Sequence, residues 1–140
     1  MAGYHYKLEI VPSEGEILHD ENYWTFQQPH PLMLEEFRKI FPNDNTWGET
    51  EEFRSDTNYS VLNVWWEEGK VWSIFVEFAP EDKGKDVFLD EILHICKKYQ
   101  YVLYSHASKN RVQPTKEELW KDFKLGHQYS MYKDRMNEFH

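Results

Sequence analysis

The stretch YSVLNVWWEEGKVWSIFVEF, Tyr59–Phe78, decides the fold because it contains two strand-like runs on either side of a short turn. Both runs are rich in β-branched and aromatic residues, and the dipeptide Glu68-Gly69 between them is typical of a two-residue hairpin turn. Such a turn puts Trp65 opposite Trp72 on one face of the hairpin. A three-residue loop, which would shift this pairing by one residue, stays open. In either register both faces of the hairpin are substantially apolar.

Hydrophobic periodicity predicts two more strands and two helices around this hairpin. Apolar residues alternate with polar ones in residues 4–10, and residues 100–106 form a compact aromatic and β-branched run, so both segments are predicted strands. Helical spacing marks residues 31–41 and 86–99. The order β-α-β-β-α-β, with short connections and right-handed crossovers, favours an α+β fold of the ferredoxin-like split βαβ class. Its antiparallel sheet would have the order 4-1-3-2, with both helices on one face.

A single domain is expected for residues 1–140. The chain is 40% hydrophobic and 17% aromatic, which is ample for one core. Residues 1–106 would form the ferredoxin-like core, and residues 107–140 a helical extension packed on it, since a capping box occupies residues 115–118. The second apolar sheet face then needs a cover, for which the candidates are this extension, the loop at residues 12–30, or the second subunit of a homodimer.

The charge of the chain restricts its partners. The net charge is −9, and the first 68 residues alone hold four Lys or Arg against fourteen Asp or Glu. An acidic surface repels nucleic acid and anionic lipid and attracts basic proteins. The sequence also lacks an apolar run of membrane-spanning length, and its single cysteine, Cys96, has no partner for an internal disulfide. We therefore expect a cytoplasmic protein that binds neither nucleic acid nor membranes.

The end of the hairpin resembles part of an RNA-binding signature. Residues 75–78, Phe-Val-Glu-Phe, fill the last four positions of the third-strand motif of RNA recognition modules, which share the β-α-β-β-α-β order. Residues 71–74 lack the basic residue, the glycine and the first stacking aromatic of that motif. The ordinary alternation of a strand explains the same residues, so RNA binding is disfavoured.

No motif for catalysis, a cofactor or a metal is present. Cys96 lies on the apolar face of a predicted helix, toward its C-terminal end, where a thiolate is disfavoured. Ser105 and His106 are neighbours on a strand and point to opposite faces, so they cannot form a catalytic pair. His5 and His106 would lie at the same end of the sheet but lack a third ligand. We expect no cofactor and no metal, and a binding protein rather than an enzyme.

Two functions remain. The first is a small acidic cytosolic binding protein, of inhibitor or immunity type, that engages a basic protein partner. Its contacts would come from the segment between the first helix and the hairpin: Asp44, Trp47, Glu49, Glu51, Glu52, Phe53 and Asp56. The alternative is a dimeric ferredoxin-like small-molecule binder or enzyme. Its apolar pocket at the sheet face would be lined by Tyr6, Trp65, Trp72 and His106.

Overall fold

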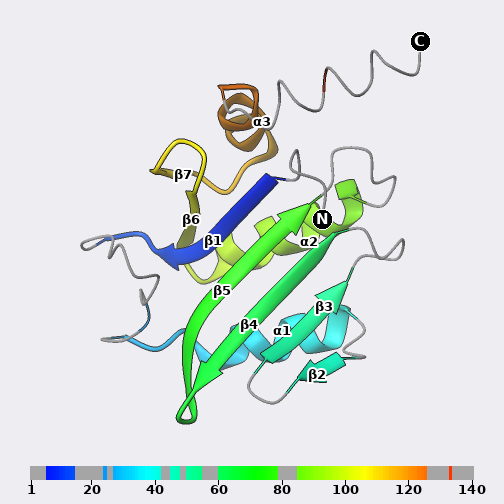
Figure 1. The fold of residues 1–140 in the computed structure, drawn as a ribbon, viewed down its shortest axis with the longest axis vertical. Helices are drawn as coiled ribbons and strands as arrows, with labels where there is room; N and C mark the ends of the chain where they lie inside the picture. The colour runs from blue at the N-terminus through cyan, green and yellow to red at the C-terminus, as the bar shows by residue number, and fades with distance from the viewer. Residues whose placement is uncertain are drawn as a thin grey trace.

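The computed structural model describes residues 6–14, 24, 27–41, 45–47, 50–54, 60–78, 85–125 and 133. This part of the chain contains strands with helices between groups of them (Figure 1). In sequence order they are β1 (Tyr6–Pro12), α1 (Pro31–Ile40), β2 (Asn45–Trp47), β3 (Thr50–Arg54), β4 (Val61–Glu67), β5 (Lys70–Phe78), α2 (Lys85–Lys98), β6 (Tyr101–Ser105), β7 (Asn110–Val112) and α3 (Lys116–Leu125).

The strands of the described residues form one seven-stranded antiparallel sheet in the order β2-β3-β4-β5-β1-β6-β7. The prediction of a four-stranded ferredoxin-like sandwich is therefore wrong. The four strands expected from the sequence correspond to β1, β4, β5 and β6, but the sheet continues through β3 and β2 on one side and through β7 on the other. The short extra strands escaped prediction because they lack alternation: in β3 only Phe53 is buried.

The β4–β5 hairpin departs from the predicted register. Close to the turn the strands pair as a two-residue turn requires, but a β-bulge between Trp65 and Trp66 shifts the pairing by one residue. Trp65 therefore pairs with Ser73 and not with Trp72. Because side chains alternate along a strand, the residues that lie side by side beyond the bulge differ from those that the two-residue turn alone would pair. The buried hairpin residues that pair side by side beyond it are Leu62, Val64, Ile74 and Val76.

Helices α1 and α2 cover one face of the sheet (Figure 1). The first begins at Pro31, where the imidazole Nδ1 of His30 accepts a hydrogen bond from the N–H of Leu32 at 3.1 Å and so caps the helix. Both helices bury one apolar side, and these side chains join the inner residues of the sheet in one core. The contributing helical residues are Met33, Leu34, Phe37, Phe88, Leu89, Ile92, Leu93, Ile95 and Cys96.

Helix α3 packs against the start of β1. Leu119 and Phe123 are buried in the common core, and the ring centroid of Phe123 lies 5.1 Å from that of Tyr6. The Tyr6 hydroxyl donates a hydrogen bond to the buried carboxylate of Asp122. Burial, and then the bond to Asp122, raise the pKa of Tyr6 well above its usual range. The segment after Leu125, apart from residue 133, lies outside the described residues.

The opposite face of the sheet is mixed in character and not the apolar surface that we expected. Lys7 is exposed, with its ammonium 4.4 Å from the centroid of the Phe75 ring. Glu9 lies on the same face of β1 as Lys7 and is fully buried. Among the described residues, a small separate apolar cluster comprises Val11, Val102 and Tyr104. This face therefore carries the charged residues Lys7 and Glu9 as well as apolar side chains.

Candidate functional site

The turn of the β4–β5 hairpin protrudes at the end of the sheet away from α3 (Figure 1). Its two central residues, Glu68 and Gly69, have φ angles of +52° and +79°, the pattern of a type I′ turn. Glu67 and Lys70 pair across the base of the turn. All four residues are exposed, so this tip presents charged side chains to a partner.

The side-chain amide of Gln28 holds the edge of β5 next to the turn. The N–H of Val71 donates to Gln28 Oε1 at 2.7 Å, and Gln28 Nε2 donates to the carbonyl of Val71 at 3.1 Å. The same Nε2 donates to the carbonyl of Trp24 at 2.7 Å. Strand β1 pairs with β5 only farther along, so the amide takes the place of a neighbouring strand. It thereby fixes the backbone beside Trp72.

A hollow of about 240 Å³ lies beside the hydrogen-bonded residues Gln28 and Val71. The residues that line it, which include one tryptophan, two glutamates, one lysine and one glutamine, are Gln28, Glu67, Glu68, Lys70, Val71 and Trp72. Neither Glu67 nor Glu68 forms an ion pair with any cation in the part of the chain that the structure describes. The residues of the hollow therefore combine an aromatic side chain with an excess of negative charge.

Trp65 is the large aromatic residue exposed nearest to this tip. It is 49% exposed and pairs with Thr50 of β3 on one side and Ser73 of β5 on the other. Small neighbours on both strands leave much of its indole in solvent. An exposed tryptophan between small residues is the kind of side chain that anchors protein–protein contacts.

The acidic segment predicted to bind a partner is used largely inside the protein where the structure describes it. Glu51 accepts hydrogen bonds from Arg38 Nε at 2.9 Å, from Arg38 Nη2 at 2.5 Å and from Trp66 Nε1 at 3.0 Å. The bond to Glu51 raises the pKa of Arg38. Glu52 pairs with Arg54 at 2.9 Å. Glu51 thus links β3 to α1 and β4, Glu52 pairs within β3, and both carboxylates are partly neutralised.

The aromatic residues of that segment have different positions. Phe53 is only 1% exposed and belongs to the core, with its ring 6.4 Å from that of Phe37, so in this conformation it has no surface to offer a partner. Three members of the predicted set lie outside the described residues: Asp44, Glu49 and Asp56. The side chain of Trp47 lies outside them too.

The four residues of the alternative pocket do not line one cavity in the described part of the chain. Tyr6 packs in the core beneath α3, while Trp72 borders the hollow at the hairpin tip. Trp65 is exposed in the middle of the β3–β4–β5 surface. His106 follows β6 and contacts β1. His5, its predicted neighbour, lies outside the described residues.

His106 and Glu9 nevertheless form a close pair that the sequence did not predict. The imidazole Nε2 lies 2.6 Å from Glu9 Oε1, and the carboxylate is fully buried while the histidine side chain is 30% exposed. The rings of Phe75 and Tyr104 flank the imidazole, with centroids at 6.2 and 5.7 Å. A buried carboxylate that engages one ring nitrogen orients the imidazole. No group of three or more potential metal ligands occurs within the described ranges.

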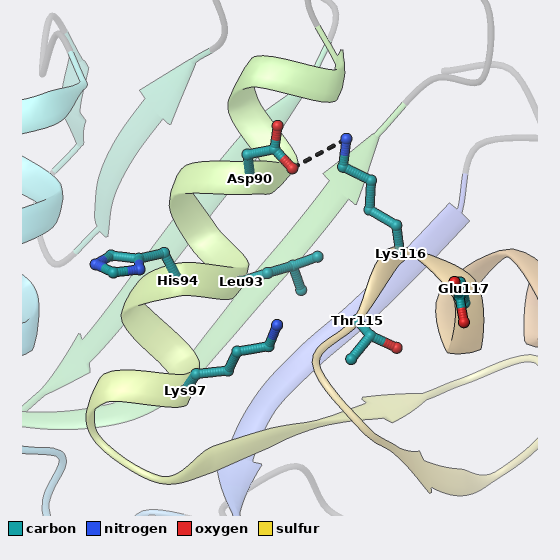
Figure 2. A pocket seen from close by; sticks show the side chains of 7 residues that line it. All are labelled: Asp90, Leu93, His94, Lys97, Thr115, Lys116 and Glu117. Atoms are coloured by element: carbon teal, nitrogen blue, oxygen red, sulfur yellow. Dashed lines mark ion pairs between the residues drawn. The ribbon is translucent and has the colours of Figure 1, made fainter.

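A second hollow, of about 460 Å³, separates α2 from the start of α3 (Figure 2). Lys116 Nζ crosses it to Asp90 Oδ1 at 2.9 Å. Leu93 and Lys97 of α2 point toward Thr115, whereas His94 of the same helix points away. The bonds to Asp90 raise the pKa of Lys116. Charges of both signs line this hollow, so it does not favour a ligand of either charge.

Cys96 is buried in α2, and burial raises the pKa of its thiol to about 12. It is therefore a core residue, with no thiolate available near neutral pH.

The site residues that sequence reasoning missed are Gln28, Glu67 and Glu68. A usable signal for the two glutamates was present, since they stand in a turn between tryptophan-rich strands.

Comparison of the chain with protein-family models, with curated proteins and with solved structures found no match. None of the helices in the described residues is long and apolar enough to cross a membrane.

Proposed function

We propose that this chain is a small cytosolic binding protein that engages a basic protein partner through the tip of its β4–β5 hairpin. One observation carries the proposal: Trp65, 49% exposed, stands at the same end of the hairpin as Glu67 and Glu68, whose carboxylates have no ion-pair partner among the described residues. The net charge of −9 has the sign that such a partner requires.

Charge and aromatic contact would have separate roles in this complex. Long-range attraction accelerates the encounter with a basic surface, and salt weakens it beyond a Debye length of about 8 Å at physiological ionic strength. A desolvated indole then slows dissociation, because large aromatic side chains supply much of the binding energy in protein interfaces. An inhibitor or immunity protein, which masks a basic surface, is the class of protein that fits this division.

The hairpin tip replaces the segment at residues 44–56 as the centre of the proposed interface. In that segment Glu51 and Glu52 already pair with arginines, and Phe53 is buried. A basic partner that bound these two carboxylates would have to replace the ion pairs that they already form. Glu67 and Glu68 have no such pair to break among the residues that the structure describes.

Capture of partners from a native lysate at low and moderate salt tests the proposal. The immobilised chain should retain a basic protein, and the variant Glu67→Gln/Glu68→Gln should retain much less of it. Glu117→Gln/Glu118→Gln is the matched control, since it removes the same charge from α3 at the far end of the sheet (Figure 1). Trp65→Ser should accelerate dissociation of the purified partner, with little change in the association rate.

Retention of the same basic protein by both charge variants would show that the tip has no special role. Retention of no basic protein by the unaltered chain would refute the proposal as a whole. Thermal unfolding of each variant confirms that the exposed substitutions leave the fold intact.

A further inference from the structure

The hollow at the hairpin tip contains the groups that recognise a planar cation. Trp72, Glu67 and Glu68 are all among the residues that line it. The lining residues include one cation, Lys70, so the two carboxylates outnumber the ammonium and the formal charge is negative. A cation that enters would gain both an aromatic face and an acceptor.

The size of the hollow restricts the ligand. Its volume of about 240 Å³ is below the roughly 300–1,000 Å³ of clefts that enclose whole small molecules. It therefore suits one side chain of a partner. The bidentate bonds between Gln28 and Val71 occupy the amide of the lining and the adjacent backbone, so the shape is established before a ligand arrives.

We propose that this hollow receives an arginine side chain of the basic partner, with its guanidinium stacked on Trp72 and hydrogen-bonded to Glu67 or Glu68. Arginine is favoured over lysine because a guanidinium is flat, is weakly hydrated and donates two parallel hydrogen bonds to one carboxylate. Lysine offers a strongly hydrated point charge, which the nearby ammonium of Lys70 repels without the compensation of stacking. The inference rests on the proposed function and names the chemical group that is recognised.

Three peptides that differ at one central position test the inference on the full chain. The position holds arginine, lysine or citrulline, which has the shape of arginine without its charge, and the flanking residues are the same lysines and glycines in all three. Binding is followed by NMR titration of the six tryptophan indole N–H signals, with that of Trp72 identified by its loss in Trp72→Leu. The arginine peptide should shift the Trp72 signal to saturation, and the other two should do so only at several-fold higher concentration.

Two variants test the two walls separately. Trp72→Leu should weaken the arginine peptide by about two- to fivefold and remove its advantage over the lysine peptide. Glu67→Gln/Glu68→Gln, which changes only exposed side chains, should also weaken the arginine peptide, whereas Glu117→Gln/Glu118→Gln should not. A melting temperature close to that of the unaltered chain shows that Trp72→Leu keeps the fold.

The outcomes separate this inference from the proposed function. Equal affinities of the arginine and lysine peptides, with salt-dependent binding lost in the hairpin charge variant, would overturn arginine recognition and leave the proposed function standing. A response of the Trp65 signal without one from Trp72 would likewise overturn the hollow as the site. No response of any indole signal to any peptide would count against both.

Discussion

Replacement of Tyr6 by phenylalanine tests how α3 is held on the sheet. The hydroxyl of Tyr6 donates to the carboxylate of Asp122, and the two residues are 1% and 9% exposed. The substitution removes a hydrogen bond to a charged acceptor and leaves that acceptor buried without its donor. Hydrogen bonds to charged groups contribute about 1.5–3 kcal/mol, so Tyr6→Phe should lower the free energy of unfolding by ~2 kcal/mol and Tm by roughly 6 °C.

Tyr101→Phe is the matched control because it also removes one hydroxyl from a buried tyrosine. That hydroxyl accepts a hydrogen bond from the N–H of His30 at 2.9 Å, a neutral pair, so its loss should cost only about 1 kcal/mol. Urea unfolding followed by tryptophan fluorescence measures both values. A cost of Tyr6→Phe no greater than that of Tyr101→Phe would refute the charged hydrogen bond as the link between α3 and β1.

The same pair predicts a loss of stability in alkali. Burial first, and then Asp122, raise the folded-state pKa of Tyr6 above the value near 10 of a free tyrosine. The folded chain therefore keeps a proton that the unfolded chain releases, so the contribution is complete below about pH 10 and declines as the pH rises above it. Tyr6→Phe should flatten this decline. The hydrogen bond to Glu36 raises the pKa of Tyr99 to about 12, so Tyr99 contributes to the decline that is left in Tyr6→Phe. Tyr99→Phe should remove this second contribution.

Three further predictions concern single residues. Iodoacetamide should modify Cys96 far more slowly in the folded chain than in urea, since burial raises the thiol pKa to about 12; equal rates would show that the helix opens readily. Gly69→Ala should lower the free energy of unfolding by about 1 kcal/mol because of its φ of +79°, although no atom of the described residues lies within 4 Å of the added methyl; an unchanged denaturation midpoint would contradict the turn geometry. His106→Ala should cost about 1–3 kcal/mol by removing the 2.6 Å contact of buried Glu9, and His106→Gln should cost less; chemical denaturation of both variants decides.

Much of the secondary structure was predictable because its patterns are long. The ten residues of α1 and the fourteen of α2 have regular apolar spacing, and the β4–β5 hairpin has a strong turn signal. Strands β2 and β7 have three residues each, too few for alternation to be detectable. They form because an existing sheet offers an edge with unpaired backbone groups, which is a property of the assembled fold and not of the segment.

The acidic segment shows why composition alone does not distinguish paired from unpaired carboxylates. Arg38 lies on a helix thirteen residues before Glu51, and only the folded chain brings its guanidinium to that carboxylate. Counting charges along residues 1–68 cannot tell which acids are paired. Glu67 and Glu68, which form no ion pair within the described part of the chain, were included in the same count but belong to a turn, where long side chains extend into solvent.

The β-bulge in the β4–β5 hairpin explains why Trp65 does not pair with Trp72 as predicted. Without it, Trp65 and Trp72 would stand opposite each other and share one surface, as the two-residue turn alone implies. The bulge pairs Trp65 with Ser73, and Trp72 instead borders the hollow beside Gln28. Alternation of side chains cannot reveal an extra residue in one strand, because both registers bury apolar residues. The two tryptophans therefore have different surroundings, and for this reason Trp65→Ser and Trp72→Leu test two distinct contacts with a partner.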